Sequence, residues 1–386
     1  MHDAVVVGAG PGGLYAALLL AQRGYDVVAL EEHQAVGEPV HCTGILAREA
    51  FDEFRLSADT ILNELTTVRF VSPAGHDIVY RTGIAEAVVI DRVAFDARLA
   101  AQADRAGAHI VHGRRVQAIR CEPDAVSVDI AGHSPLRARA CVLACGGRYG
   151  LHRQLGLSLP ALFLHTAQRE LPADQPHDVE VHFGADIAPK GFAWAVPVRR
   201  GDRSHVRIGV MCDGDAPRYF RRMVDRVRSS WHVKAENIGP PRQKILPLTV
   251  ISQTYMNRLL VVGDAAGLVK PTTGGGIYYS LLSAAVAAEV LADAFGRDHL
   301  GAATLAEYEH RWRARLEAEL NAQLSLRLIA QRMSDDDIEN LFELARTDGV
   351  MPIVRRTASF NRHRALILTL FKHPPARQIL FRHLVC

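Results

Sequence analysis

The sequence predicts an α/β protein with three parts: a discontinuous Rossmann-type nucleotide-binding domain, an inserted and mostly antiparallel β-sheet domain for the substrate, and a C-terminal helical region. Three observations predict it. An apolar run followed by closely spaced glycines opens the chain, a second such combination occurs far downstream, and short segments broken by Pro, Gly and Asp lie between them. The length of 386 residues suits two or three domains of about 150 residues each.

The amino-terminal segment has the pattern of a dinucleotide-binding βαβ unit. Ala4 to Val7 form a continuous apolar run, as in a strand buried on both faces, and residues 26–30 form the next run after a helical stretch. The glycines of the intervening turn are Gly8, Gly10, Gly12 and Gly13. Their spacing allows a tight turn, lets a pyrophosphate approach the backbone, and brings helix and strand together. We therefore expect a phosphate at the N-terminus of this helix, with the Glu31 carboxylate on a ribose hydroxyl.

A second glycine cluster indicates a cofactor larger than one dinucleotide fingerprint needs. A buried strand is predicted over 259–262, and a long helix begins near residue 276. The residues expected at the cofactor here are Gly263, Asp264, Gly274, Gly275, Gly276 and Ile277. Asp264 can bind a chain of sugar-like hydroxyls, and the helix start can stabilise a ring that carries negative charge. This combination favours FAD over NAD.

The remaining segments complete the domain plan. Residues 92–105 are predicted as a helix, and 126–130 and 138–143 as strands of the nucleotide-binding domain. We expect the FAD-binding domain at 1–55 with 85–158 and 252–300, the substrate sheet domain at 56–84 with 159–251, and the helical region at 301–386.

Composition narrows the classes of function. The net charge of +3 is too balanced for a nucleic-acid binder. The six cysteines have neither zinc-like nor iron–sulfur-like spacing, so no metal site is predicted. No signal-peptide pattern is present and no apolar run reaches the length of a membrane span, so we expect a cytoplasmic protein.

Taken together, these motifs resemble the FAD-dependent group that contains the aromatic hydroxylases and, within it, the geranylgeranyl reductase family. The shared features are the two glycine clusters, Glu31, Arg92 with Asp96, and the segments 39–44 and 191–197. Segment 39–44 carries Cys42 where family members have a cysteine followed by small residues. Segment 191–197 is similar to the family's Tyr-x-Trp-x-Phe-Pro pattern, with Phe192 at the tyrosine position, Trp194 retained, and Val196 at the phenylalanine position.

The resemblance implies an FAD-dependent reductase that saturates C=C bonds of a prenyl chain or isoprenoid lipid by hydride transfer from reduced flavin. It places Arg92 at the cofactor and Cys42 near the flavin ring, where the thiol would help to deliver a proton. Phe192 and Trp194 would form an apolar wall over the ring. A packed thiol and a core aromatic are the structural alternatives for Cys42 and Trp194. Electrons would come from NAD(P)H or from a reduced electron carrier.

Three other functions fit parts of the pattern: a flavin-dependent monooxygenase on a hydrophobic or aromatic substrate, a quinone-linked dehydrogenase, and a non-catalytic prenyl-binding protein. The hydroxylases carry an Asp-Gly pair where this chain has Cys145 and Gly146, which disfavours a hydroxylase. The halogenases need a lysine in the N-terminal half, and this chain has none before Lys190, which argues against a halogenase.

Lys270 stands where the family more often has a neutral polar residue. We expect a solvated loop lysine there, with stabilisation of the reduced ring as the alternative.

The tail carries a separate signal. After Asp348 the chain has no acidic residue, while it contains seven Arg or Lys. Leu380, Phe381 and Leu384 recur at helical spacing among them. The pattern favours either peripheral contact with an anionic membrane through 353–386 or a helix packed on the body with its basic face in solvent.

Overall fold

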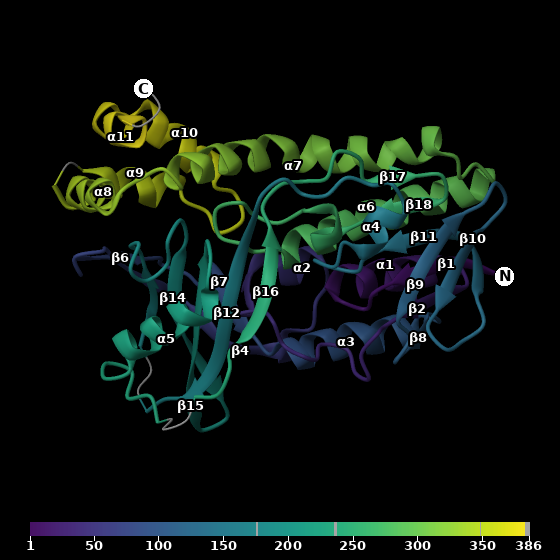
Figure 1. Ribbon diagram of the computed structural model, residues 1–386, viewed down its shortest axis with the longest axis horizontal. Helices are drawn as coiled ribbons and strands as arrows, with labels where there is room; N and C mark the ends of the chain where they lie inside the picture. The colour runs from purple at the N-terminus through teal and green to yellow at the C-terminus, as the bar shows by residue number, and fades with distance from the viewer. Residues whose placement is uncertain (175–176, 235–237, 348, 383–386) are drawn as a thin grey trace.

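The structure, a computed structural model, describes residues 1–174, 177–234, 238–347 and 349–382. Figure 1 shows an elongated molecule in which two sheet-containing bodies lie next to each other beneath a layer of helices. The N-terminus lies at the far end of one body, and the C-terminal helices lie above the other. The α/β class, with a largely antiparallel insertion and a helical C-terminal region, is confirmed.

The first body is built on an eight-stranded sheet whose parallel strands run in the order β18–β11–β1–β2–β8. Strand β17 pairs antiparallel with β18 at one edge, and β9 and β10 form an antiparallel ribbon beside β11. The strands are β1 (His2–Val7), β2 (Val27–Leu30), β8 (His109–Val111), β9 (Val116–Cys121), β10 (Val126–Ile130), β11 (Leu136–Leu143), β17 (Tyr255–Met256) and β18 (Leu259–Val261).

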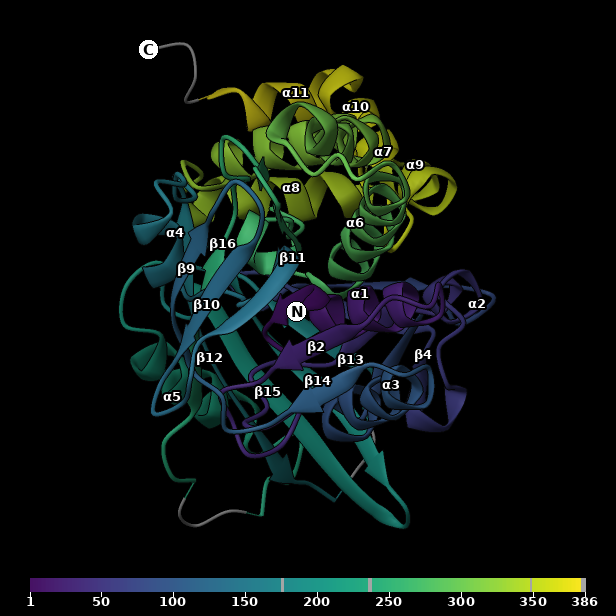
Figure 2. The same cartoon turned by 90° about the vertical axis from the view of Figure 1, so that its right-hand side faces the viewer.

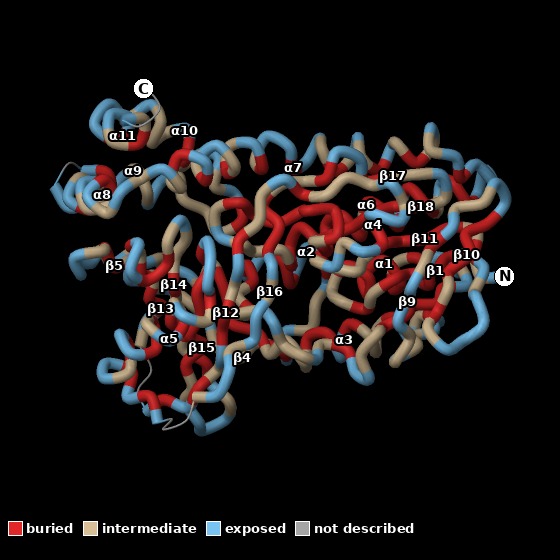
Figure 3. The backbone as a smooth tube through the Cα atoms, in the orientation of Figure 1, coloured by how far each residue is buried: buried red, intermediate tan, exposed pale blue. Residues whose placement is uncertain are grey.

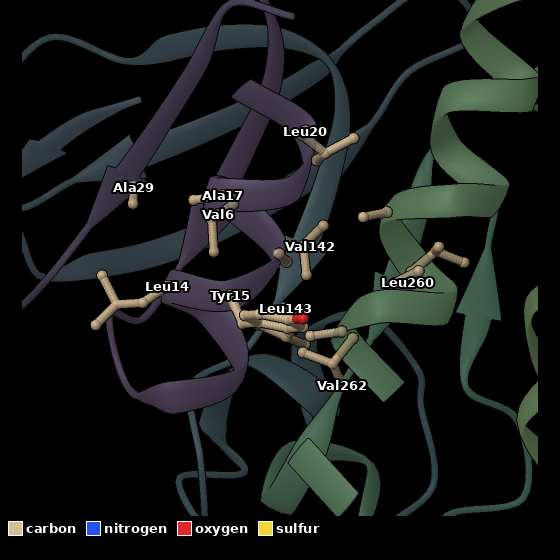
Figure 4. Close-up of a cluster of buried hydrophobic side chains, with 14 of the residues drawn as sticks. Val6, Leu14, Tyr15, Ala17, Leu20, Ala29, Val142, Leu143, Leu260 and Val262 are labelled. Carbon is tan, nitrogen blue, oxygen red and sulfur yellow. The ribbon is translucent and has the colours of Figure 1, made fainter. Parts of the chain in front are cut away.

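Helices pack against this sheet, and the apolar residues of its central strands are buried. Figure 2 shows α1 (Pro11–Ala21) lying between α6 (Ile277–Arg297) and α3 (Arg92–Arg105). Val6 and Val142, on neighbouring strands, have no exposed surface, and Figure 4 shows them in a buried cluster that includes Ala17 of α1. The continuous apolar runs of the sequence are therefore strands buried on both faces. The start of α3 is capped by Asp91, whose carboxylate accepts from the backbone N–H groups of Val93 and Ala94.

The second body is a seven-stranded sheet in the order β16–β12–β15–β14–β13–β5–β6. Its pairs are antiparallel except β13 with β5, which is parallel. The strands are β5 (Thr67–Val71), β6 (Asp77–Arg81), β12 (Phe163–Pro172), β13 (Val179–His182), β14 (Phe192–Arg200), β15 (Arg203–Cys212) and β16 (Arg242–Pro247). Helix α5 (Ala216–Val227) packs on one face through Phe220 and Met223, and the opposite face looks into a cavity.

A small sheet joins the two bodies. It has the order β3–β7–β4, with β3 (Ile45–Ala47), β4 (Ile61–Leu65) and β7 (Ala87–Ile90). Strand β4 falls in the segment expected to belong to the substrate domain, and it pairs with β7 of the segment expected to belong to the FAD-binding domain. The short helices α2 (Glu49–Glu53), η1 (Ala58–Thr60), α4 (Gly150–Gln154) and η2 (Gly263–Ala266) complete the connections.

The C-terminal region is helical, as expected. It consists of α7 (Ala302–Ala330), α8 (Asp335–Thr347), α9 (Val350–Thr357), α10 (Arg364–Lys372) and α11 (Pro374–Leu380). Helix α6, which precedes it, is long and apolar enough to cross a membrane by length and composition, contrary to our expectation from the sequence. However, 72% of its apolar window is buried inside the fold, so it is a core helix here. Figure 3 shows the buried residues concentrated around α1, α6 and the sheets, with exposed residues along the outside of α7.

Two expectations for single side chains are corrected by the structure. Lys270 is 3% exposed and therefore is not a solvated loop lysine. Leu380 is also buried, because it packs with Ile329 and Ala376, so it cannot enter a membrane while the tail is folded in this way. Phe381 packs against Phe371, with ring centroids 5.1 Å apart. Leu384, the third residue of that predicted face, lies outside the described residues.

Candidate active site

One cavity of about 2090 Å³ extends between the two bodies and the C-terminal helices. It brings together segments that lie far apart in the sequence: both glycine clusters, the 37–45 loop, one face of β14, and parts of α7 to α11. Each residue predicted for the site lies on its wall: Gly8, Gly10, Gly12, Gly13, Glu31, Cys42, Arg92, Phe192, Trp194, Gly263, Asp264, Gly274, Gly275, Gly276 and Ile277. Their individual roles stay predictions.

The first glycine loop is shaped by close backbone packing on one side and open space on the other. A Cβ atom at Gly13 would lie 1.9 Å from the carbonyl oxygen of Gly8, and one at Gly8 would lie 2.5 Å from that of Ala144. At Gly10, by contrast, a Cβ would meet nothing within 4 Å. The loop therefore holds β1, β11 and α1 together while Gly10 leaves a cradle at the helix N-terminus, which suits an approaching pyrophosphate.

Glu31 is 8% exposed and is oriented by hydrogen bonds from the protein. Its Oε2 accepts from the backbone N–H of Ala9 at 2.9 Å. Its Oε1 accepts from the backbone N–H of His33 at 2.9 Å and lies 2.6 Å from Nδ1 of the same residue. A carboxylate oxygen can accept two hydrogen bonds, so Oε2 retains capacity for a ribose hydroxyl.

At the second cluster, two hydrogen bonds hold Asp264 in place. Its Oδ2 accepts from the Nζ of Lys244 at 2.6 Å, and its backbone carbonyl accepts from the hydroxyl of Tyr149 at 2.9 Å. A Cβ at Gly276 would lie 2.6 Å from its Oδ1, so glycine is needed at that position. Lys244 extends from β16 of the second body, and the neighbouring Asp264 carboxylate raises the pKa of its ammonium. This ion pair bridges the two bodies at the cavity.

Arg327 of α7 braces the loop that leads into α6. Its Nε donates to the carbonyl of Pro271 at 2.8 Å and its Nη2 to that of Thr272 at 2.6 Å. Its Nη1 donates to the carbonyl of Lys190, in the connection before β14, at 2.9 Å. Burial lowers the pKa of Arg327 to about 10, so it remains a cation near neutral pH. A single side chain thus connects the helical region, the second body and the second glycine loop.

The Cys42 segment also lines the cavity and is hydrogen-bonded to the second sheet. Arg207 donates through Nη1 to the carbonyl of Thr43 at 2.6 Å, and the Thr43 hydroxyl donates to Oε1 of Gln168 at 2.9 Å. Gly44 has a φ of +73°, and a Cβ there would lie 2.6 Å from Nη1 of Arg207. The backbone N–H of Gly44 lies 3.3 Å from the sulfur of Cys42. These contacts fix where the thiol lies on the cavity wall.

Two cations interact electrostatically with Cys42. Burial disfavours the charged form of Arg92, but Asp96 and Cys42 together outweigh it and raise the pKa of the guanidinium. Its Nη2 donates to the two carboxylate oxygens of Asp96 at 2.8 and 3.1 Å. Lys244 also interacts electrostatically with Cys42. The Nε of Arg92 is buried and has no hydrogen-bond partner among the residues that the structure describes.

The aromatic wall lies on one face of β14. Ala193 and Ala195 pack beneath α5, whereas Phe192 and Trp194 alternate with them and face the cavity, with ring centroids 5.8 Å apart. Gly209 pairs with Trp194 on the next strand, and a Cβ there would lie 2.3 Å from the indole. The indole therefore packs directly against Gly209.

The sequence motifs did not indicate several of these groups. Four of them belong to no recognisable local motif, because their partners lie far away in the sequence: Lys244, Tyr149, Arg207 and Arg327. A pattern of backbone-binding arginines has no fixed spacing along the chain, so no local signal could have identified them. In the part of the chain that the structure describes, no group of three or more His, Cys, Asp or Glu side chains could hold a metal ion.

The donor set and the open glycine cradle fit FAD. Comparisons with known proteins agree. Residues 1–322 match the family described as the FAD binding domain. The chain is 31% identical over 363 residues to the digeranylgeranylglycerophospholipid reductase of Methanocaldococcus jannaschii, covering 89% of this chain and 90% of that protein.

Solved structures share the fold. A geranylgeranyl bacteriochlorophyll reductase-like protein from Thermoplasma acidophilum has a TM-score of 0.82 at 23% identity, covering 100% of this chain and 99% of its own. A variant of the halogenase PltM in complex with FAD has a TM-score of 0.67 at 16% identity, covering 99% of this chain and 85% of its own. The chain belongs to the FAD-binding-domain family, within its geranylgeranyl reductase-like members, and is an FAD-dependent oxidoreductase.

Proposed function

We propose that this protein saturates C=C bonds of a prenyl chain, of geranylgeranyl type or within an isoprenoid lipid, using reduced FAD. The observation that carries the proposal is the cavity of about 2090 Å³. It exceeds the roughly 300–1,000 Å³ of ordinary ligand sites, and it continues past the cofactor cradle into an apolar lobe. Such a space suits a flavin together with a long hydrocarbon chain.

The apolar lobe supports a prenyl substrate by its composition. It lies between the second sheet and the C-terminal helices. Its wall includes Val181, Phe183, Met211, Leu246, Leu326, Ile338, Leu341, Phe342, Val354, Leu366 and Ile367. Such a wall excludes water and places an apolar chain without binding a particular polar group. The relative from Methanocaldococcus jannaschii is named as a reductase of a digeranylgeranyl lipid, which is consistent with this substrate class.

The cofactor half would be held by the residues already described. Gly10 and the start of α1 would receive the pyrophosphate, Glu31 a ribose, and Asp264 the hydroxyl chain, with the ring against Gly274 to Ile277. When bound, FAD supplies the hydride. The protein supplies placement: an isolated alkene offers no carbonyl to polarise, so orientation and exclusion of water must account for most of the catalysis.

Hydride addition to one carbon of the alkene requires a proton at the other. We assign this proton to the Cys42 thiol, which lies on the cavity wall and interacts electrostatically with two cations. After donation the sulfur carries a negative charge, which Arg92 and Lys244 would stabilise until a proton returns from solvent. Phe192 and Trp194 would press the chain toward the reacting face.

Product analysis tests the proposal. Purified holoenzyme, reduced with dithionite under argon, is incubated with geranylgeranyl diphosphate or a digeranylgeranyl glycerol phosphate, and the product is analysed by mass spectrometry. We expect added hydrogen and no added oxygen. A product that gains oxygen and forms only in air would identify a monooxygenase, and a preparation that stays colourless with FAD would identify a non-catalytic binder.

The electron donor is proposed in two forms, NAD(P)H or a reduced electron carrier. Stopped-flow mixing of oxidised holoenzyme with NADH or NADPH distinguishes them. Flavin reduction within the turnover time identifies direct use of the nicotinamide. If dithionite-driven turnover proceeds but neither nucleotide reduces the flavin, a carrier is the donor.

A further inference from the structure

Lys270 is a buried cation directly behind the second glycine loop. Its backbone closes that loop: its N–H donates to the carbonyl of Gly275 at 3.1 Å, and its carbonyl accepts from the N–H of Gly274 at 2.8 Å. Its side chain runs beneath the loop, with Cδ 3.6 Å from the position of a Cβ at Gly275. Both glycines line the cavity. Lys270 is therefore separated from the cofactor space by the thickness of one backbone segment.

Neutral groups hold the ammonium of Lys270. Its Nζ donates to the carbonyl of Phe360 at 2.8 Å and to Oδ1 of Asn361 at 2.7 Å. It also lies over two aromatic rings, 4.6 Å from the centroid of Phe360 and 6.0 Å from that of Tyr279. No carboxylate lies within ion-pair distance of it in the described part of the chain. A buried cation without a contacting anion is costly, so a fold that retains one calls for an explanation.

The charged groups around Lys270 come from each neighbouring element. Glu49 of α2 accepts from the Asn361 amide at 2.8 Å, and Glu319 of α7 accepts from the backbone N–H groups of His363 and Arg364. Tyr279 of α6 keeps its proton, because burial raises its pKa. Arg327 of α7 donates a hydrogen bond to the carbonyl of Pro271, the residue after Lys270.

Lys270 is the member of this group that changes charge near neutral pH. Burial lowers the pKa of Lys270 to about 7, against the opposing effect of Glu319 and Glu49. Burial and the neighbouring Lys270 lower the pKa of His363 to about 4, so its imidazole is neutral near neutral pH. His363 is linked to the same loop, because its Nδ1 lies 2.7 Å from the hydroxyl of Thr272.

We propose that Lys270 is a positioning residue that stabilises the negative charge gained by the flavin ring on two-electron reduction, and that its amine takes up a proton as the ring is reduced. The reductant supplies two electrons, the ring keeps one proton and a net negative charge, and a second proton passes from solvent to the Lys270 amine. The inference rests on FAD binding in this cradle and is independent of which alkene is reduced.

The sign of the effect follows from linkage. A negative ring raises the pKa of the nearby ammonium, so the reduced form is favoured wherever Lys270 is protonated. That advantage is fully present below about pH 7, where the amine is already charged in the oxidised protein. It is lost as the pH rises through the higher pKa of the reduced protein. Between these limits, reduction takes up an additional proton.

Potentiometric titration of the holoenzyme without substrate tests the proposal. Midpoint potentials are measured from about pH 6 to about pH 9, a range that brackets neutrality. The proteins are the wild type, Lys270→Met and, as a control, Lys372→Met on the exposed tail. At low pH we expect the Lys270→Met substitution to disfavour the reduced form about tenfold, which is 29.6 mV for a two-electron couple. The difference should fade at high pH, and the control should follow the wild type. Superimposed wild-type and Lys270→Met curves would overturn the proposal.

A second variant keeps the proposal testable if Lys270→Met does not fold. Asn361→Ala retains the lysine but removes one acceptor of its ammonium, so the bend in the plot of potential against pH should move to lower pH. A bend that stays in place, or that is absent from the wild type, contradicts the assignment. Loss of FAD would appear separately, as colourless protein, and a failure to reduce prenyl chains would not affect these measurements.

Discussion

Gly10 and Gly13 serve the same motif for different physical reasons. Gly13 cannot carry a side chain because β1 and α1 touch at that point, where a Cβ atom would lie 1.9 Å from the Gly8 carbonyl oxygen. Gly10 has room for one in the protein, since nothing lies within 4 Å. Its side chain would instead enter the space of the cofactor. A substitution at Gly13 should therefore disturb folding, whereas a substitution at Gly10 should disturb cofactor binding.

The Gly10→Val substitution should abolish FAD binding while the protein stays folded. Because the new side chain points into open space and Gly10 has a φ of −78°, the free protein should tolerate it, whereas the pyrophosphate should not. We expect affinity to fall at least about a hundredfold, measured by the flavin absorbance retained after gel filtration. Gly83→Val, at an exposed turn with open space, is the control and should remain yellow. Equal flavin content in both variants would contradict the cradle.

Cys42 is the residue whose role is easiest to separate from packing. Cys42→Ser keeps a small hydroxyl but is a far weaker acid, and Cys42→Ala removes the proton donor. Both variants should retain FAD and slow substrate-dependent oxidation of the flavin by about 10²–10⁴-fold, the usual contribution of a general acid. Cys121→Ser, on β9, is the control. Full activity of Cys42→Ala would reduce the thiol to a packing role.

The pairing of Gly209 with Trp194 gives a test of the aromatic wall. The methyl group of Gly209→Ala would lie 2.3 Å from the indole, so the ring must move toward the cavity. We expect FAD to be retained and KM for the prenyl substrate to rise, because the ring would occupy the substrate's space. Gly209→Ala in a Trp194→Phe background should have much less effect, since the smaller ring leaves room. Equal effects in both backgrounds would contradict this account.

At the scale of elements, periodicity predicted the parallel core well. The runs that became β1, β2, β11 and β18 are mostly apolar because both faces of the sheet are buried there, and the predicted helix over 92–105 matches α3. The run over 126–130 became β10 of the antiparallel ribbon. Helix α5, by contrast, lies in a segment whose pattern predicted strands. The parallel pairing of β5 with β13 was not foreseen either, because it joins residues separated by more than a hundred positions.

The C-terminal helices remain a predicted membrane contact, now of a different kind. Leu380 is buried, yet the seven Arg and Lys residues of the tail are exposed: Arg355, Arg356, Arg362, Arg364, Lys372, Arg377 and Arg382. Attraction to anionic lipid should therefore be electrostatic, worth up to about 1 kcal/mol for each residue at the surface. Co-sedimentation should show binding to anionic but not neutral vesicles, weakening as salt shortens the Debye length below about 10 Å. Binding that ignores lipid charge and salt would contradict this prediction.

At the scale of the whole molecule, the site arises where three parts of the chain meet. The glycine-rich segments of the cavity wall could be predicted because glycine motifs have fixed spacing and local causes, while their contacts with a cofactor stay predictions. The side chains that connect the parts could not be predicted, because Lys244 contacts Asp264 and Arg327 contacts Pro271 only after both bodies and the helical region assemble. The burial of Lys270 has the same origin: the segment around Asn361 that covers it comes from the tail.

We propose that reduced FAD in this cavity transfers hydride to an isolated alkene. Anaerobic single-turnover oxidation tests it most directly: the holoenzyme is reduced with one equivalent of dithionite under argon, mixed with geranylgeranyl diphosphate or a digeranylgeranyl glycerol phosphate, and followed at the flavin absorbance band. The account predicts that the oxidised spectrum returns without oxygen, and more slowly in Cys42→Ala. A flavin that stays reduced with every prenyl substrate until air is admitted would contradict it.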